Sequence, residues 1–247
     1  MRSESVRLLK TLPHPCGYYP DRVAQNLVID PLAADLPEVY QLALSRGYRR
    51  AGGHIYRPAC ARCSACVPAR VAVAEFAPTR SQRRCLRRNS DLSFADAPAR
   101  FDDEVFNLYR RYLAARHRGG GMDEADRDDF GRFLTSAWSP TRFFEYRLGG
   151  HLLAVAVTDV VRHGLSSVYT FYEPDETARG LGTFCILHQV AECRRRALPY
   201  VYLGYWIDGH PKMGYKQNFQ PLELLHGHGW ERAAIAGRPA TDPEQTA

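Results

Sequence analysis

Four cysteines in the first part of the sequence have the spacing of a metal site. Cys60, Cys63 and Cys66 stand two residues apart in CARCSAC, and Cys16 lies upstream in PCGYYP. Two-residue gaps let successive thiolates turn toward one ion from a tight loop, and both zinc and iron–sulfur sites use this spacing. The sequence therefore predicts a Zn or Fe–S site with Cys16 as the fourth ligand. The alternative is that these are small, buried, apolar side chains.

Two of the chain's three lysines lie close together after an aromatic run. Lys212 and Lys216 follow YVYLGYW at residues 200–206, whereas arginine carries most of the charge of the 33 basic residues. On a short helix both lysines would project from one face, where an anion near them would offset their repulsion. The spacing predicts a phosphate site, and the alternative is a pair of ordinary surface charges.

A dense run of arginines at residues 80–88 could contact a phosphate backbone. On a helix, the arginines of RSQRRCLRR would cover most of the circumference, and guanidinium groups bind phosphates well. The alternative is a solvated charged surface, because a net charge of +6 alone says little about partners. The run consists of Arg80, Arg83, Arg84, Arg87 and Arg88.

Glycines precede a predicted helix in the stretch ARGLG, which contains Arg179, Gly180 and Gly182. Glycine lets backbone N–H groups at a helix N-terminus approach an anion or an acyl ester closely. The stretch is predicted to contact the acyl donor. The alternatives are a tight turn or a phosphate loop for coenzyme A.

Composition and length set the limits of what the chain can be. Its 247 residues suffice for two small domains or one large one, and 45% of them are hydrophobic, enough for a core. The sequence has no apolar run of about 18 residues and no signal-peptide pattern. We therefore expect a cytoplasmic protein with reduced cysteines and no membrane partner.

The predicted elements change character near residue 100. Residues 1–100 contain strand patterns at 25–31, 54–58 and 67–76 and a helix pattern at 36–48, which indicate a small cysteine-containing α+β domain. Residues 101–236 are predicted to form a second domain, and residues 237–247 a disordered tail.

The second domain has a recognisable order of elements. Helices are predicted at 101–117 and 123–138, with a flexible break at 118–122. Three antiparallel strands, a helix and a further strand follow. They are predicted at 141–148, 151–162, 165–174, 182–198 and 200–206. This is the core order of the acetyltransferase-type (GNAT) fold. The predicted fold class is therefore α/β (α+β), with a GNAT-like mixed sheet whose strands splay apart beside the helix N-terminus.

Four motifs, in order, resemble the arginyltransferase family of aminoacyl-tRNA–protein transferases. They are PCGYYP, CSACVPAR, SSVYTFYEPDETARGLGTFCILHQV and YVYLGYWIDGHPKMGYK, and they span the chain from about Cys16 to about Glu223. The resemblance is closest to the short bacterial branch, the aspartate/glutamate leucyltransferases. The chain departs from the eukaryotic branch at Tyr19, where that branch has a second cysteine.

The resemblance implies an aminoacyltransferase. Leucine, or alternatively arginine, would move from its aminoacyl-tRNA to the α-amine of proteins that begin with Asp or Glu, which marks them for N-degron degradation. The aminoacyl ester is already activated, so acyl transfer requires no cofactor. The enzyme must align the amine, accept one proton and stabilise an oxyanion.

Residues near the predicted strand ends are the candidates for these roles. Glu173 or Asp208 would accept the proton, beside Tyr169 and Tyr205. Lys212, Lys216 and Tyr215 would hold the 3′ end of the tRNA, together with the ARGLG turn. Arg70 and the arginines of residues 80–88 would meet the acidic side chain of the acceptor or the tRNA stem.

Two other functions fit parts of the sequence. An acetyl-coenzyme A-dependent N-acetyltransferase would have a fuller glycine-rich pyrophosphate loop than ARGLG. A zinc-containing nucleic-acid-binding module would give the aromatic strand at 200–206 and the two lysines no role.

Overall fold

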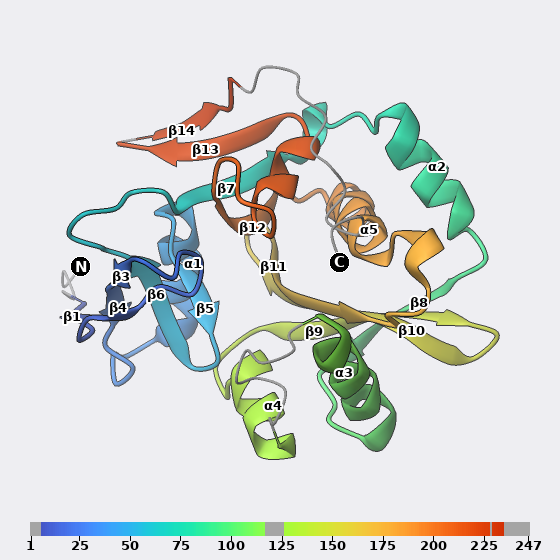
Figure 1. The fold of residues 1–247 in the computed structure, drawn as a ribbon, viewed down its shortest axis with the longest axis horizontal. Coiled ribbons are helices and arrows are strands. Elements are labelled where there is room, and N and C mark those ends of the chain that lie inside the picture. The colour runs from blue at the N-terminus through green and yellow to red at the C-terminus, as the bar shows by residue number, and fades with distance from the viewer. Residues whose placement is uncertain (1–5, 117–125, 228, 235–247) are drawn as a thin grey trace.

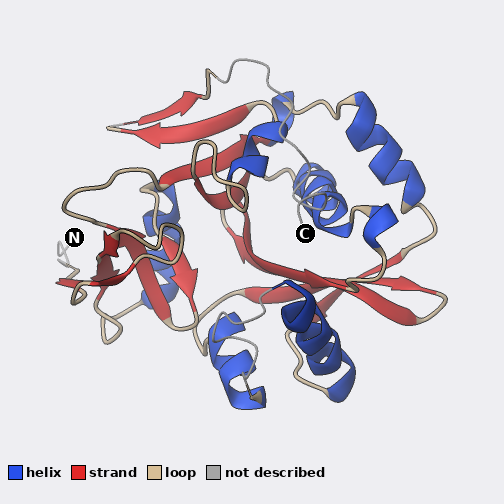
Figure 2. Cartoon of the chain, in the orientation of Figure 1, coloured by secondary structure: helices blue, strands red, loops and turns tan. Residues whose placement is uncertain are grey.

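An eight-stranded mixed sheet runs through the middle of the molecule (Figures 1 and 2). The computed structural model describes residues 6–116, 126–227 and 229–234. In spatial order the strands are β14 (Gly229–Arg232), β13 (Leu222–His226), β7 (Val67–Ala72), β12 (Tyr200–Trp206), β11 (Gly164–Tyr172), β10 (His151–Val161), β9 (Thr141–Leu148) and β8 (Ser93–Pro98). The mixed α/β class predicted from the sequence is confirmed.

The strands β9, β10 and β11 form the predicted antiparallel meander. The turn between β9 and β10 consists of Gly149 and Gly150, both with positive φ, as two-residue hairpin turns require. The helix α5 (Leu181–Arg195) and the strand β12 follow, and β12 is parallel to β11. The GNAT-like order is therefore present.

Helices cover both faces of this sheet (Figure 1). On one face, α5 packs through Phe184 and Leu187 into the main core, with α2 (Arg80–Arg88) beside it. On the other face, α3 (Asp103–Arg116) and α4 (Arg127–Leu134) enclose a second, aromatic core around Phe130. The helix predicted at 123–138 is shorter in its described part, because the backbone becomes extended at Thr135.

A separate lobe lies to the left of the sheet in Figure 1. Its four-stranded sheet has the order β1 (Leu8–Lys10), β4 (Asn26–Ile29), β6 (His54–Pro58) and β5 (Arg49–Ala51). The helix α1 (Leu36–Ser45) packs on it through Tyr40 and Leu44, and β2 (His14–Pro15) pairs with β3 (Val23–Ala24).

Residues before position 100 also contribute to the large sheet. β7 lies between β12 and β13, and the strand predicted at 67–76 ends at Ala72, where the 3-10 helix η1 (Val73–Glu75) begins. The edge strand β8 pairs with β9. The domain boundary near residue 100 stays a prediction, but the large sheet takes strands from both sides of it.

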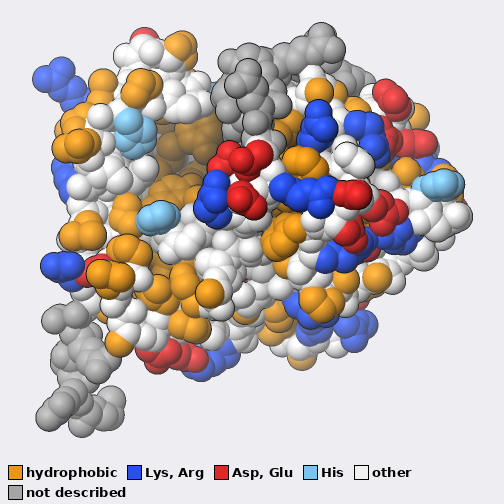
Figure 3. Space-filling model, turned by 90° about the horizontal axis from the view of Figure 1, so that it is seen from below, with side chains coloured by type: hydrophobic (Ala, Val, Ile, Leu, Met, Phe, Trp, Pro, Cys, Tyr) orange, Lys and Arg blue, Asp and Glu red, His pale blue; other side chains and the backbone are white. Residues whose placement is uncertain are grey.

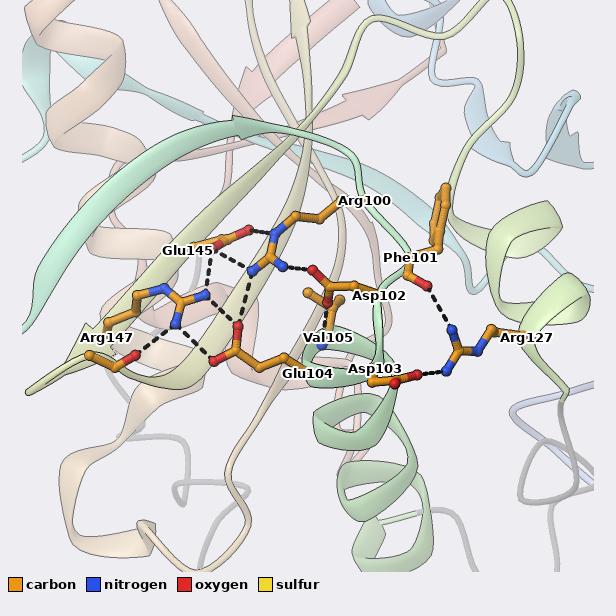
Figure 4. Close-up of polar contacts among 10 residues, drawn as sticks. Arg100, Phe101, Asp102, Asp103, Glu104, Val105, Arg127, Glu145 and Arg147 are labelled. Atoms are coloured by element: carbon orange, nitrogen blue, oxygen red, sulfur yellow. Dashed lines mark hydrogen bonds and ion pairs between the residues drawn. The ribbon is translucent and has the colours of Figure 1, made fainter.

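Ion pairs fasten α3 to the edge of the sheet (Figure 4). Arg147 on β9 donates to Glu104 of α3 at 2.6 and 2.8 Å and to Glu145 at 3.1 Å, and Arg100 contacts both carboxylates. These arginines hold the pKa of Glu104 at about 2. Each cation in this network has an acidic partner, so its charges balance within the protein.

Within the described residues, no helix is both long and apolar enough to cross a membrane. The predicted break at 118–122 and the predicted tail at 237–247 lie outside the described residues.

Candidate active site between the splayed strands

The parallel strands β11 and β12 pair along only part of their length. Gly164 to Ser166 pair with Tyr200 to Tyr202, after which β11 stays with β10 and β12 stays with β7. The carboxyl ends of the two strands therefore separate, as predicted for a GNAT-like sheet. The gap exposes backbone groups that a ligand or a side chain from elsewhere can bind.

The side chain of Arg49, on β5 of the N-terminal lobe, reaches into this gap. Its Nη2 donates to the carbonyls of Ser167 at 2.6 Å and Val168 at 3.5 Å, just beyond the last β11–β12 pair. Its Nη1 is buried and has no hydrogen-bond partner. One guanidinium thus bridges lobe and sheet and keeps an unused donor inside the protein.

Gly204 makes room for this guanidinium. It has a φ of +81°, lies at a bulge in the β12–β7 pairing, and a Cβ there would overlap Nη1 and Cζ of Arg49. A glycine is required both by the backbone conformation and by the close approach of the arginine. These two constraints explain why a glycine stands inside the aromatic strand YVYLGYW.

Lys216 lies in the 3-10 helix η3 (Gly214–Asn218) and is only 3% exposed. Its Nζ is 3.5 Å from the sulfur of Met213 and 4.7 Å from the centre of the Tyr215 ring. Burial, reinforced by the charge of Arg49, lowers the pKa of Lys216 to about 7, against a smaller opposing effect of Cys66. Lys216 is thus a buried amine within the electrostatic reach of Arg49, and it loses its proton near neutral pH.

The two lysines do not share a helix face. Lys212 is exposed and precedes η3, whereas Lys216 is buried, so the predicted common surface is wrong. The reason is that the chain after β12 turns through His210, whose Nε2–H donates to the carbonyl of Tyr18 at 3.2 Å and whose ring meets Tyr18 and Tyr19 edge-on. This packing joins the motif PCGYYP to the motif HPKMGYK.

Two tyrosines and a tryptophan lie on the strands that border the gap, Tyr169 on β11 and Tyr205 and Trp206 on β12. The hydroxyl of Tyr205 donates to the carbonyls of Gly47 and Tyr56, at 3.1 and 3.2 Å, so it holds the lobe against β12. The buried Tyr169 hydroxyl and the indole N–H of Trp206 lack hydrogen-bond partners. Burial raises the pKa of both Tyr169 and Tyr205, so near neutral pH both hydroxyls stay protonated and can donate a hydrogen bond but do not act as phenolate bases.

The two predicted carboxylates differ in their contacts. Oε2 of Glu173, directly after β11, accepts two hydrogen bonds from Arg111, at 2.8 and 3.0 Å. Asp208, two residues after β12, is exposed, and none of its side-chain contacts in the described structure is an ion pair. Only Asp208 therefore has a carboxylate that is not already paired.

The ARGLG turn is held by α2. Gly180 has a left-handed conformation before α5, and the Arg179 side chain pairs with Asp91 at 2.9 Å and Glu176 at 3.0 Å. Gly182 lies against the ring of Tyr172, which a Cβ would approach to 3.4 Å. The Arg179 side chain thus holds the turn in place. The backbone N–H groups of the first turn of α5 have no acceptor within the helix.

Arg70 is also engaged within the protein. It pairs with Glu223 at 2.6 Å and its guanidinium stacks on Tyr200 at 3.5 Å and on Trp230 at 4.2 Å. It is 8% exposed, so it fastens β7 to its neighbours.

The arginines of α2 differ from the other basic residues. The helix begins at a capping box of Thr79 and Gln82 and is anchored by Gln82, Cys85 and Asn89. Its five arginines are exposed, and among the described residues none of them forms a salt bridge. Arg83 and Arg88 donate to the carbonyls of Pro78 and Ala178. The surface of α2 is therefore positively charged, and among the described residues no carboxylate forms an ion pair with its arginines.

The four predicted metal ligands line one cavity of about 290 Å³, together with Tyr19 and Arg22. Arg22 donates to Sγ of Cys63 at 3.2 Å, and the N–H of Ala65, together with Arg22, lowers the pKa of that thiol. Burial raises the pKa of Cys66 to about 11. In the described part of the chain no three His, Cys, Asp or Glu side chains are placed to hold a metal ion. The Zn or Fe–S site at these four cysteines therefore stays a prediction, and no chemical step is assigned to a metal.

A hollow lies beside the N-terminal lobe. Seen from below, the molecule is hollowed to the right of this lobe, and hydrophobic side chains form the floor (Figure 3). Basic and acidic side chains lie side by side over the right half of the same face (Figure 3).

Sequence reasoning missed Arg49, Gly204 and Trp206 as site residues. Arg49 lies next to Arg50, and no motif or regular spacing around the two arginines indicates a functional site. The glycine within an aromatic strand was the available signal, because glycine inside a strand often marks a close backbone approach.

Comparison with known proteins gives consistent matches. Residues 14–84 match the family model for the arginine-tRNA-protein transferase N terminus, and residues 104–226 match the model for its C terminus. An aspartate/glutamate leucyltransferase of Stenotrophomonas maltophilia is 55% identical over 93% of this chain and 94% of its own. Proteins of the same name are 51% identical in Xylella fastidiosa (92% of each chain) and 48% identical in Pseudomonas fluorescens (91% and 96%).

One solved structure, of L-PGS from Bacillus licheniformis, has a TM-score of 0.49 and 12% identity, over 63% of this chain and 56% of that one. The matches in sequence confirm the resemblance drawn from the four motifs.

Proposed function

The chain belongs to the arginine-tRNA-protein transferase family, and from this premise we propose that it transfers leucine from leucyl-tRNA to the α-amine of proteins that begin with Asp or Glu. The observation that carries this proposal is the identity of 48–55% to aspartate/glutamate leucyltransferases over more than nine tenths of each chain. Such a product would mark the acceptor for N-degron degradation in the cytoplasm.

The reaction is aminolysis of an ester. The acceptor's neutral α-amine attacks the leucyl carbonyl, a C–N bond forms, the C–O bond to the tRNA ribose breaks, and the amine loses one proton as the ribose hydroxyl gains one. An α-amine with a pKa of about 7.7–8.0 is partly neutral at cellular pH, so a weak base suffices. No cofactor is required, because the ester is already activated.

We place this reaction in the gap between β11 and β12. The hydroxyl of Tyr169 and the indole N–H of Trp206 are buried donors without partners, suited to a carbonyl oxygen that becomes negatively charged. Tyr205 positions the N-terminal lobe through its two hydrogen bonds. Of the two carboxylates, Asp208 is the better candidate for accepting the proton, since Glu173 is paired with Arg111.

The tRNA is proposed to approach along α2. Its exposed arginines lack acidic partners among the described residues, which leaves them available for phosphate contacts. Lys212 is exposed and can contact the 3′ end, whereas Arg179 and Arg70 are held by carboxylates. Tyr215, half-buried beside Lys216, is placed to line the aminoacyl end rather than the phosphates.

Product mass distinguishes this function from its rivals. The purified protein is incubated with a peptide that begins with Asp, together with leucyl-tRNA, arginyl-tRNA or acetyl-coenzyme A. We expect the mass gain of one leucyl residue with leucyl-tRNA only. An arginyl product would assign the other amino acid, and an acetyl product or no product would contradict the proposal.

A further inference from the structure

The buried side of α2 carries two amides, one near each end of the helix. Gln82, in the first turn, is 5% exposed, and Asn89, at the C-terminal cap, is 1% exposed. Their spacing in the sequence corresponds to about 10 Å along an α-helix. Because buried amides are hydrogen-bonded in folded proteins, the partners of these two side chains show what each end of the helix is fixed to.

The first amide joins α2 to the segment that follows β12. Nε2 of Gln82 donates to the carbonyl of Asn218, the last residue of η3, at 2.9 Å. Its Oε1 accepts from the backbone N–H of Thr79 at 2.8 Å and so belongs to the capping box that begins the helix. The oxygen of this amide therefore caps α2, and the nitrogen fixes α2 to η3.

The second amide joins α2 to the segment that follows β11. Nδ2 of Asn89 donates to the carbonyl of Arg179, in the turn before α5, at 2.8 Å and to that of Cys85 at 2.9 Å. Sγ of Cys85 donates to the next carbonyl of the turn, that of Gly180, at 3.5 Å. The C-terminal end of α2 is thus fixed to the turn before α5.

The helix α2 therefore connects the two segments that leave the splayed strands. The strand β11 continues into the turn at residues 177–180, and β12 continues into η3, so each amide holds the chain on one side of the gap. In Figure 1, α2 lies beside α5 on the same face of the sheet. The exposed side of α2 carries the five arginines that form no ion pair among the described residues. A ligand bound to these arginines is held at a fixed distance from both sides of the gap.

We propose that α2 aligns the tRNA with the reaction gap, and that Gln82 and Asn89 are positioning residues for transfer of the aminoacyl group. This inference rests on the proposed function and adds to it a structural connection between the tRNA-binding surface and the gap. Phosphates bound to the arginines of α2 place the ester correctly only if α2 does not shift against the strand ends. A misplacement of about 1 Å between reacting groups can lower a rate by about 100-fold.

Replacing one NH₂ group by oxygen releases each end of the helix separately. Gln82→Glu keeps the oxygen of the capping box, where Glu is a usual residue, and removes the donor to Asn218. Asn89→Asp removes the donor to Arg179 in the same way. With saturating leucyl-tRNA and a peptide that begins with Asp, the single-turnover rate of leucyl transfer should fall about tenfold in each variant.

Both replacements add a negative charge to the proposed tRNA-binding helix, so each is compared with an exposed neighbour. Ser81→Asp and Ser90→Asp add the same charge at the two ends of α2. Within each pair, the Kd for leucyl-tRNA should increase by the same factor, because both variants change the charge equally. At saturation the serine variants should keep the wild-type rate, and a pair with equal rates would overturn the inference.

The double variant distinguishes positioning from local damage. If α2 needs both amides to stay in place, releasing one end already removes the alignment. Gln82→Glu combined with Asn89→Asp should then remain about tenfold below wild type, with rates expressed per folded molecule from urea denaturation. Two independent local effects would multiply to about 100-fold, and that result would contradict the proposal.

Uncharged replacements cover a failure of either charged variant to fold, judged by its thermal melt. Gln82→Met and Asn89→Ala remove the same donors without burying a carboxylate, and we expect the same tenfold loss from each and from both together. If wild type itself does not leucylate the Asp peptide, the proposed function fails. Variant rates that stay at the wild-type level, or that multiply, leave that function intact and overturn only the role given to α2.

Discussion

Arg49 and Arg50 are neighbours on β5, yet they occupy opposite kinds of surroundings. Arg50 is fully buried and donates to both oxygens of Asp159 at 2.8 Å, and its other donors reach the carbonyls of Gly52 and Leu134. Asp159 in turn accepts from Tyr40 and Thr141. This centre is complete within the protein.

Arg49 points to the other face of the strand, because successive side chains alternate. There it meets backbone carbonyls and Gly204, and its charge acts on Lys216, with one donor unpaired and no acid bound to it among the described residues. The difference separates two uses of an arginine, one fully buried and one half-buried. Where donors and acceptors balance, the charge serves the fold, and where they do not, a ligand can complete the set.

The largest expected effect concerns the ion pair of Arg50 and Asp159, where donors and acceptors balance. Asp159→Asn leaves Arg50 buried without its counter-charge, so the free energy of unfolding should fall by about 3–5 kcal/mol. Urea denaturation measures this change. Leucyl transfer per folded molecule should stay at the wild-type level, and a selective loss of activity in a stable variant would show that this centre is not merely structural.

A stability change of opposite sign is expected at Lys216, which lies near Arg49 and has no acidic partner among the described residues. Lys216→Met removes a buried cation that faces Arg49 from β5, Cys66 from the loop before β7 and Tyr215 from its own element. We expect a gain in unfolding free energy on the order of 2–4 kcal/mol near pH 6, since folding must desolvate the ammonium.

The pH dependence of that gain follows from linkage. The pKa of Lys216 is lowered from 10.5 to about 7 in the folded protein. Below pH 7 the lysine is charged in both states and its full penalty applies. Between about pH 7 and 10.5 the unfolded state binds more protons, so the stability of wild type rises relative to the variant and the gap closes. A gap that is constant from pH 6 to 10 would contradict the buried-cation description.

The sequence predicted the regular part of the fold well. The meander β9–β11, the helix α5 and the strand β12 follow from alternation, glycine turns and a 3.6-residue period, all of which are local. The insertion of β7 between β12 and β13 was not predicted, because that pairing joins residues about 130–150 positions apart and no local pattern records it.

The site was predicted only in outline. The strand at residues 200–206 with basic residues after it was predicted correctly, but Lys216 is buried where an exposed side chain was expected. Arg49 and Arg50 look alike in the sequence, and only the distant partners Ser167 and Asp159 distinguish them. The role of such a side chain depends on tertiary contacts, which the local sequence does not record.

A smaller effect is expected where Arg49 meets the sheet. Gly204→Ala places a methyl group against the guanidinium at a positive φ, and should cost about 1–3 kcal/mol of stability and lower leucyl transfer about 10- to 100-fold. Gly149→Ala is the matched control, because Gly149 also has a positive φ of 53° but no atom lies within 4 Å of an added Cβ. It should lose about 1 kcal/mol and no activity, and equal activity losses in both variants would remove the role given to Arg49.

The smallest effects extend the comparison to the surface. Arg84 and Arg87 on α2 have no acidic partners among the described residues, whereas the exposed Arg162 pairs with Glu38 at 3.0 Å. If unpaired arginines contact the tRNA, each Arg→Gln change on α2 should weaken binding a few-fold and reduce the slope of log Kd against log salt by about 0.7–0.9. Filter binding of leucyl-tRNA at several salt concentrations measures both. Arg162→Gln removes the same net charge and should leave the slope at the wild-type value, so equal slopes for all three variants would mean that tRNA senses only the overall charge.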